Sequence, residues 1–306
     1  MDQLAAIRAF LAVAEAGGFA KAARRAGVAT SSLTRQVDGL ERHLAVRLFN
    51  RSTRQVTLTA AGVHYRRQVL EILDDLESAD ESVGEADGPP RGQLRVAAPV
   101  AFARLHIAPY LAAFLERYPA IEVDLRLSDR LVDLVDERLD LAVRLGVLPP
   151  SRLLARRLAP HRRVLCASPA YLDRQGVPKG LDDLATHNCL TLGGDRPARL
   201  WHFIQGDEVQ TVRVGGSLCA DNSEVLHQAA LCGAGLVVLP TWLVGDDLKA
   251  GRLQPLLTAW QAGPDGAEGA ISAVTLSNRR GSKKIGAFVD FLRQRYGDPP
   301  YWDIAG

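Results

Sequence analysis

Apolar residues at three- and four-residue spacing predict three short helices at the start of the chain. The spacing holds over residues 4–14, and the glycine pair 17–18 ends that helix. Residues 19–26 form a short alanine-rich helix, Gly27 breaks the chain, and residues 30–44 form the third. Two short helices joined by a glycine-containing turn are typical of a helix-turn-helix, although a small three-helix bundle without a DNA role gives the same pattern.

Polar side chains at the start of the third predicted helix favour the DNA-binding interpretation. Hydroxyl, amide and guanidinium groups can hydrogen-bond to base edges and phosphates. The group comprises Thr30, Ser31, Ser32, Thr34, Arg35 and Gln36. Further on, Arg51, Thr53 and Arg54 stand in a polar turn before a short strand at residues 56–58. A basic hairpin beside a recognition helix is a wing that reaches phosphate or the minor groove, and a solvated turn is the alternative.

Residues 59–85 predict one long helix with Thr59 as its N-cap. Apolar residues recur along it at alternating spacings of four and three, which is the a/d pattern of a coiled coil. This stripe comprises Tyr65, Val69, Ile72, Leu76, Ala79 and Val83. The stripe favours a dimerising helix, and its packing against the chain's own domains is the alternative. Residues 85–92 have the composition of a hinge.

From residue 93 onward, strand-like and helix-like runs alternate. The first series predicts strands at 94–97, 121–127 and 139–145, with helices at 102–118 and 131–138. A βαβαβ series favours a parallel, Rossmann-like sheet. The second series begins near residue 163 and predicts strands at 163–167, 188–192 and 236–239, a hairpin over 199–218, a helix at 223–232, and a final strand and helix at 271–276 and 283–296. Two α/β lobes would leave a cleft between them, the usual place for a small ligand.

Composition and charge narrow the class of protein. The chain has 306 residues, of which 47% are hydrophobic and 24% charged, which excludes a disordered or collagen-like chain. The net charge of +2 divides into +5 over residues 1–58, −6 over residues 59–88 and +3 over residues 89–306. The basic head indicates a polyanionic partner. We find no signal peptide and no apolar run long enough to span a membrane, and therefore expect a cytoplasmic protein with no membrane contact, whose four cysteines are reduced and buried.

An ordered series of motifs runs through residues 19–62: Ala22, Ala23, Val28, Thr34, Gln36, Leu40, Glu41, Arg47, Leu48, Phe49, Arg51, Arg54, Leu58, Thr59 and Gly62. The series resembles the N-terminal domain of LysR-type transcriptional regulators. Residues 98–99, 139–146 and 233–240 are similar to the effector-binding domain of that family. Ala29 replaces the serine that the family usually carries before the recognition helix, which would move the N-cap to Thr30.

The resemblance implies a fold and an assembly. The fold is an α/β chain with an all-α-type winged helix-turn-helix head, a long linker helix, and a bilobal, periplasmic-binding-protein-like effector domain of two Rossmann-like lobes. We place the head at 1–58, the linker (dimerisation) helix and hinge at 59–88 and the effector domain at 89–306, with lobe I at about 89–160 and 268–306 and lobe II at about 161–267. The expected partners are an interrupted inverted repeat in double-stranded promoter DNA, a second copy in a homodimer or homotetramer, and a small-molecule effector.

The resemblance also implies site residues. DNA contacts fall on Thr30, Ser31, Ser32, Thr34, Arg35, Arg51, Thr53 and Arg54. Effector contacts fall on Pro99, Val100, Ala101, Phe102, Ser128, Arg144, Gly146 and Asn222. The first loop lacks the hydroxyl common in regulators that bind carboxylates, although backbone amides at a helix start can hold an anion. We therefore expect a small, mostly apolar or aromatic effector with one acidic group, and an ion pair with a nearby aspartate is the alternative role for Arg144.

Three other functions are alternatives: an enzyme, a solute-binding protein and a redox sensor. The sequence has no phosphate-binding glycine loop, no nucleophile elbow and no zinc-protease motif, so we expect no enzyme, no cofactor and no metal site. A bilobal solute-binding protein would share the C-terminal pattern, but the basic head argues against it. A redox sensor would rest on the four cysteines, whose spacing follows no known motif.

Overall fold

The fold is taken from a computed structural model that describes residues 2–51, 55–84, 88–193, 200–263 and 269–303. Internal contacts divide the chain into two compact units. One comprises residues 1–83 with 135–138, and the other comprises residues 84–134 with 139–306.

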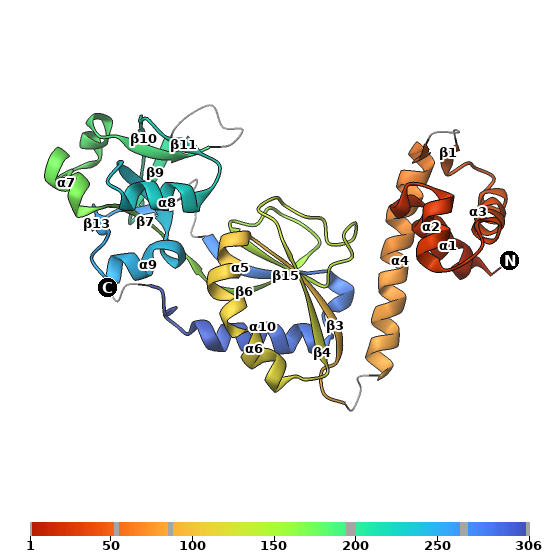
Figure 1. The fold of residues 1–306 in the computed structure, drawn as a ribbon. Coiled ribbons are helices and arrows are strands. Elements are labelled where there is room, and N and C mark those ends of the chain that lie inside the picture. The colour runs from red at the N-terminus through yellow and green to blue at the C-terminus, as the bar shows by residue number, and fades with distance from the viewer. Residues whose placement is uncertain (1, 52–54, 85–87, 194–199, 264–268, 304–306) are drawn as a thin grey trace. The chain divides into compact units, whose positions relative to one another are not determined.

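The N-terminal unit is a three-helix head with a two-stranded wing, followed by a long helix (Figure 1). Asp2 caps the first helix by accepting from the Ala5 amide, and Gly17 ends it with a left-handed backbone. The apolar faces predicted from the sequence meet in one core around Phe10, which contacts the Phe49 and Tyr65 rings. The elements are α1 (Gln3–Ala16), α2 (Phe19–Ala26), α3 (Thr30–Leu44), β1 (Phe49–Arg51), β2 (Val56–Leu58) and α4 (Ala60–Gly84). The helix-turn-helix prediction is confirmed.

Two residues fix α4 to the wing. The Thr59 hydroxyl accepts from the Gly62 amide at 2.9 Å and donates to the Arg47 carbonyl at 2.8 Å, so the predicted N-cap is confirmed. Gly62 is required by close approach, because a Cβ there would lie 2.1 Å from the Leu48 carbonyl oxygen. The helix therefore starts at a defined angle to β1.

The apolar stripe of α4 serves two surfaces. Val69 is buried and Tyr65 half-buried against the core of the head, so packing on the chain's own domain accounts for this part of the stripe. Ile72 and Leu76 lie further along and are 57% and 39% exposed. Val83 is among the α4 residues whose side chains are not described. The exposed residues leave a surface that the head does not cover.

The first lobe of the C-terminal unit is a five-stranded sheet of order β4-β3-β5-β15-β6. β3 pairs in parallel with β4 and β5, whereas β15 pairs antiparallel with β5 and β6, so the sheet is mixed rather than all-parallel. Figure 1 shows α5, α6 and α10 against this sheet, where Phe114 contacts the Phe288 and Phe291 rings. The elements are β3 (Gly92–Ala98), α5 (Val100–His106), α6 (Ala108–Arg117), β4 (Ile121–Leu127), β5 (Leu141–Gly146), β6 (Leu154–His161), β15 (Gly269–Thr275), η2 (Ser277–Arg279) and α10 (Lys283–Tyr296).

The second lobe is an eight-stranded sheet in which β10-β9-β14-β7-β12-β8-β11 follow one another and β13 also pairs with β7. The predicted hairpin is confirmed as the antiparallel pair of β9 and β10, while β12 pairs antiparallel with β7 and parallel with β8. The elements are β7 (Arg163–Ala167), α7 (Pro169–Gln175), η1 (Leu181–Thr186), β8 (Cys189–Leu192), β9 (Leu200–Gln205), β10 (Glu208–Arg213), β11 (Cys219–Ala220), α8 (Ser223–Leu231), β12 (Leu236–Pro240), α9 (Thr241–Lys249), β13 (Gln254–Leu256) and β14 (Gln261–Gly263).

The predictions for two helices of the first lobe were wrong, because one is divided into two helices and the other is not helical. The single helix expected over 102–118 is two helices, because Pro109 lies in the first turn of α6 and lacks the amide that a continuous helix needs. The helix expected over 131–138 is a series of turns. Its backbone ends in a left-handed Arg138, and the Val132 carbonyl accepts from the Arg144 side chain instead of from a helical amide.

The C-terminal segment after α10 contacts the first lobe through the Trp302 ring and the second lobe through the Asp303 carboxylate. Trp302 is 1% exposed, and its ring lies 4.5 Å from His106 and 4.9 Å from Tyr296. Asp303 accepts from Arg162 Nη1 at 2.8 Å and from the Thr241 hydroxyl at 2.6 Å. The segment therefore ties α10 and α5 of the first lobe to α9 of the second.

Candidate nucleic-acid interface and ligand pocket

The outer surface of α3 carries the hydroxyl and guanidinium groups predicted from the sequence. Thr30, Ser31 and Arg35 are exposed, and Ser32 and Thr34 are half-buried. The Thr34 hydroxyl donates to the Thr30 carbonyl at 2.9 Å, which leaves its lone pairs free to accept a hydrogen bond. Arg35 Nε donates to the Ser31 carbonyl at 3.4 Å, so the terminal nitrogens of its guanidinium point past the helix. The surface therefore offers donors, acceptors and a positive charge side by side.

The predicted shift of the N-cap to Thr30 was wrong. α3 starts at Thr30, and the N-cap residue is Ala29, whose extended backbone has φ −68° and ψ 137°. Alanine has no side-chain acceptor, so no side chain caps the first turn.

Arg51 of the wing is held by acidic residues of α3. Its Nη2 atom lies 2.7 Å from Asp38 Oδ1 and 2.8 Å from Glu41 Oε2, and its guanidinium carbon lies 4.9 Å from the Phe19 ring centroid. The other Glu41 oxygen accepts from the Leu48 and Phe49 amides at 2.8 and 3.1 Å. Thr53 and Arg54, the other predicted wing contacts, lie outside the described residues.

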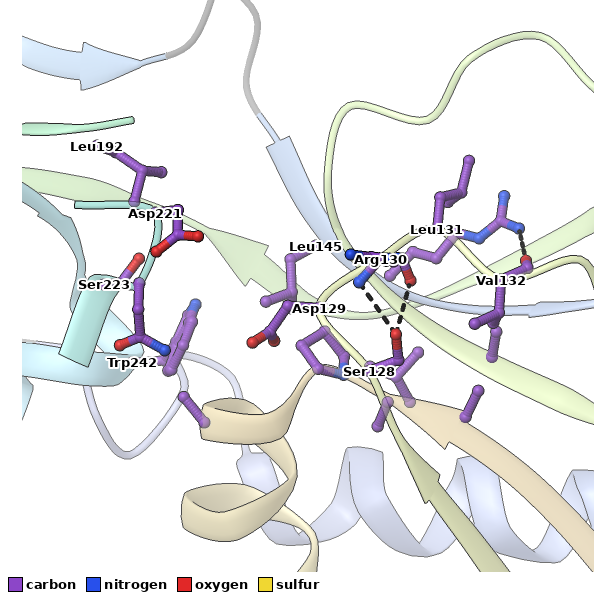
Figure 2. Close-up of a pocket in the computed structure, with 18 of the residues that line it drawn as sticks. Ser128, Asp129, Arg130, Leu131, Val132, Leu145, Leu192, Asp221, Ser223 and Trp242 are labelled. Carbon is purple, nitrogen blue, oxygen red and sulfur yellow. Dashed lines mark hydrogen bonds between the residues drawn. The ribbon is translucent and has the colours of Figure 1, made fainter. Parts of the chain in front are cut away.

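The C-terminal unit contains a pocket of about 370 Å³ lined by residues from both of its sheets (Figure 2). Pro99 and Ala101 come from the end of β3 and the start of α5, Ser128 follows β4, Arg144 lies on β5, and Asn222 precedes α8. These five predicted effector residues are therefore brought together. Leu131, Val147 and Leu192 add large exposed apolar side chains to the lining, and Leu131 is 72% exposed.

Both helix starts beside the pocket are capped by the chain itself. Asp129 Oδ1 accepts from the Val100 amide at 3.0 Å, at the start of α5. Asn222 Oδ1 accepts from the Glu224 and Val225 amides at 2.9 and 3.1 Å, at the start of α8. Of the backbone amides at the start of α5, that of Val100 is therefore already bonded to a carboxylate of the protein.

The guanidinium of Arg144 has no acidic partner among the interactions described for this part of the chain. Its Nη2 donates to the Val132 carbonyl at 3.2 Å, and its Nε is buried without a hydrogen-bond partner. The ion pair considered as an alternative is replaced by this bond to the backbone. A buried cationic donor without an acceptor costs free energy, which an acidic ligand group would recover.

Trp242 of α9 forms part of the pocket wall opposite Ser128 and Asp129 (Figure 2). Its Nε1 donates to His161 Nδ1 at 3.3 Å. Burial, and next the charge of Arg163, lower the pKa of His161 to about 3, which keeps the imidazole neutral and able to accept. The indole orientation is therefore fixed from behind the pocket.

Three predicted effector residues do not line the pocket. Phe102 is fully buried, with its ring 5.4 Å from Trp242, and so supports the wall from behind. Val100 is exposed at the start of α5, and Gly146 ends β5 with a φ of 97°. None of the three is among the lining residues.

Comparison with known proteins finds two family models along the chain. Residues 4–63 match the family described as "Bacterial regulatory helix-turn-helix protein, lysR family", and residues 87–297 match "LysR substrate binding domain". The regulator DmlR of Escherichia coli K12 is 33% identical over 95% of this chain and 94% of its own length. The solved structure of CrgA, a LysR-type transcriptional regulator from Neisseria meningitidis, has a TM-score of 0.60 at 32% identity, and the match covers 94% of this chain and 97% of that one. A regulator of Xanthomonas campestris is 35% identical over 94% of this chain and 83% of its own length.

The chain belongs to the LysR family. It is a DNA-binding transcriptional regulator with an effector-binding domain, and the relatives named above are transcriptional regulators. The helix-turn-helix match also removes the basis for a solute-binding protein without a DNA role. Within the described residues of this LysR-type chain, no single helix is long and apolar enough to cross a membrane, and only the bent pair of α1 and α2 passes that test together.

Sequence reasoning missed two residues that shape these sites in the LysR-type chain. Glu41 was noted as part of a motif but given no role, although its carboxylate joins α3 to the wing. Trp242 stands in no motif that marks it as a pocket residue, although it forms part of the pocket wall. Only the fold brings these positions together.

The cysteines differ from the expectation that all four are buried. Cys166 and Cys189 are buried, and burial raises the pKa of each thiol to about 12. Cys219 and Cys232 are exposed, which corrects the prediction for those two. No disulfide joins them, and no group of three or more potential metal ligands occurs in the described parts of the chain.

Proposed function

We propose that the protein controls transcription by binding promoter DNA through α3 and the wing, in response to a small molecule held between the two lobes. In this proposal residues 1–58 bind DNA, residues 59–88 link and pair two chains, and residues 89–306 sense the effector. The observation that carries the proposal is the polar outer surface of α3, where Thr30, Ser31 and Arg35 are exposed on a helix-turn-helix. We assign the chain no catalytic activity and place it in the cytoplasm with its DNA.

The operator is an interrupted inverted repeat read by two copies of the chain. Ile72 and Leu76 support this assembly, because large apolar side chains on a helix are stabilised when they are buried against a partner. A symmetric dimer places two recognition helices on the same face of DNA, one helical turn or a multiple of it apart. A tetramer would repeat the same pairing.

The effector is a small molecule with a mostly apolar body and one acidic group. The exposed apolar side chains of Leu131, Val147 and Leu192 would be covered by such a body. The acidic group is assigned to Arg144, whose buried Nε needs an acceptor, rather than to the amide at the start of α5. A carboxylate that accepts from this guanidinium group forms a charge-assisted hydrogen bond, which is stronger than a bond between neutral groups.

Binding of the full-length protein to its own upstream intergenic DNA tests the DNA-binding part of the proposal. Fluorescence anisotropy with a random-sequence competitor, across a salt series, separates specific from phosphate-driven binding. Specific binding persists with competitor, whereas loss of all binding at modest salt would contradict the choice of operator.

A matched pair of probes tests the effector site. We expect 3-phenylpropanoate to raise the unfolding temperature of the C-terminal unit more than 3-phenylpropanol, which has the same body without the acid. Arg144→Gln should make the two probes raise the unfolding temperature equally, because it removes the guanidinium group that binds the carboxylate of 3-phenylpropanoate. Arg152→Gln is the control, since it removes an exposed positive charge that does not line the pocket. Equal shifts by both probes on the unaltered protein would contradict the acidic-group assignment.

A further inference from the structure

Arg51 of the wing contacts three residues on two other elements of the head through one guanidinium group. One nitrogen, Nη2, lies within 2.8 Å of a carboxylate oxygen of both Asp38 and Glu41 on α3. The planar group lies over the ring of Phe19, the first residue of α2. A wing arginine is expected on sequence grounds to contact phosphate, but here its charge is already shared by two carboxylates.

Glu41 completes the connection between α3 and the wing. Its side chain is only 13% exposed, and both of its oxygens are used. Oε1 accepts from the backbone amides of Leu48 and Phe49 where the chain enters β1, and Oε2 accepts from Arg51 where the chain leaves β1. One carboxylate of the recognition helix therefore holds both ends of the first wing strand.

The pairing of Arg51 opposes a phosphate contact at its guanidinium group. Its Nη2 already lies against two carboxylates, so a phosphate close to Arg51 would be repelled by Asp38 and Glu41. The other basic residues that line the same surface hollow have no such pair described with them: Arg35, Arg42 and Arg47. Arg35 differs, because it is exposed and its described hydrogen bond is to a neutral carbonyl of its own helix. The two arginines therefore have different environments on the same surface.

We infer that Arg51, Glu41 and Asp38 form a clamp that fixes the wing relative to the recognition helix, and that Arg51 is a positioning residue that does not touch DNA. The inference rests on the proposed function, in which α3 and the wing bind the operator together. When the clamp is intact, both elements fit one DNA geometry at the same time. When it is broken, the wing moves independently of α3, and the preference for operator over random DNA falls.

The direction in which Glu41→Gln changes operator binding distinguishes the clamp from a direct contact of Arg51 with phosphate. If Arg51 bound phosphate, Glu41→Gln would release it and strengthen binding, whereas Arg51→Gln would weaken binding. In the clamp both substitutions weaken the connection between α3 and β1, so both lower the operator preference, by about threefold to tenfold for Arg51→Gln and by less for Glu41→Gln, which leaves the pair of Arg51 and Asp38 in place. The double variant loses about as much as Arg51→Gln alone, because that variant already removes both ion pairs.

The experiment measures anisotropy of full-length variants on the upstream intergenic fragment and on a random duplex of equal length, across a salt series. The salt slope for Arg51→Gln should stay close to that of the control Arg8→Gln, which removes an exposed charge of α1 outside α3 and the wing. A direct phosphate contact would instead lower the slope by about 0.9. A lower slope for Arg51→Gln, or stronger operator binding by Glu41→Gln, would overturn the inference.

Two further measurements keep the test decisive. If Glu41→Gln does not fold, Asp38→Asn replaces it, since it removes one carboxylate and leaves the Glu41 bonds to the backbone in place; it should lower the preference in the same direction. If the unaltered protein shows no preference for the fragment, the proposed operator fails, and thermal unfolding of the same double-variant cycle still tests the clamp. Additive losses of unfolding temperature would then overturn it.

Discussion

Truncation of Trp302 tests whether the C-terminal segment holds the two lobes together. The side chain is 1% exposed and lies against His106 and Tyr296, and a buried tryptophan removes about 200 Å² from water. At about 25 cal/mol per Å² the loss in Trp302→Ala is about 5 kcal/mol. The indole Nε1 is buried without a partner, and its removal returns about 1–3 kcal/mol. We therefore expect the free energy of unfolding to fall by about 3 kcal/mol.

The assay is urea unfolding of the full-length protein, followed by circular dichroism. Only the transition of the C-terminal unit should shift, because Trp302 belongs to that unit. Trp302→Phe is the matched control, since it keeps an aromatic ring and removes the unpartnered N–H, and it should cost less than about 1.5 kcal/mol. A loss below about 1 kcal/mol in Trp302→Ala, or an equal loss in Trp302→Phe, would refute the reasoning.

Three further predictions concern the linker helix, a buried histidine and the thiols. Ile72→Asp should weaken self-association of the chain, measured by analytical ultracentrifugation. Val63→Asp should not, because Val63 is about equally exposed but lies on the opposite face of α4. Equal effects of the two variants would show that the apolar stripe with Ile72 and Leu76 is not the interface. Burial lowers the pKa of His106 to about 4, so between pH 6.5 and 4 the unfolded chain binds a proton that the folded chain does not. The free energy of unfolding should therefore fall by up to about 3 kcal/mol as the pH falls through this range. His106→Gln should reduce this pH dependence, as measured by urea titrations at several pH values. Iodoacetamide at pH 8 should alkylate exposed Cys219 in the native protein and spare Cys166 until it unfolds, as read by peptide mass spectrometry; native labelling of Cys166 would contradict its burial.

The sequence predicts the elements whose signals are local. Helical periodicity located α1 to α3, glycines marked the ends of α1 and α2, and the Thr59 cap located the start of α4. The turns at 131–138 escaped prediction because their stability depends on Arg144, a side chain that reaches them from a neighbouring strand. The break before α6 had a local signal in Pro109 that the apolar periodicity concealed.

In the candidate sites, too, the sequence predicts residues that share one element but not contacts between distant elements. The α3 residues follow from one helix face, so the sequence places Thr30 and Arg35 together on the surface. The role of Arg51 does not follow, because its two carboxylate partners lie 10 and 13 positions earlier on another element. The pocket wall formed by Trp242 and the capping of α5 by Asp129 also depend on pairs that are distant in sequence.

The position of Trp242 allows ligand binding in the pocket to be followed by intrinsic tryptophan fluorescence. The chain has four tryptophans, and this one combines contact with the pocket and a fixed orientation through its hydrogen bond to His161. A molecule that enters the pocket changes the polarity around the indole and with it the wavelength and intensity of emission. Trp242→Phe removes that signal while the other three indoles continue to emit. The unlabelled protein is therefore its own reporter for a fluorescence screen of candidate effectors.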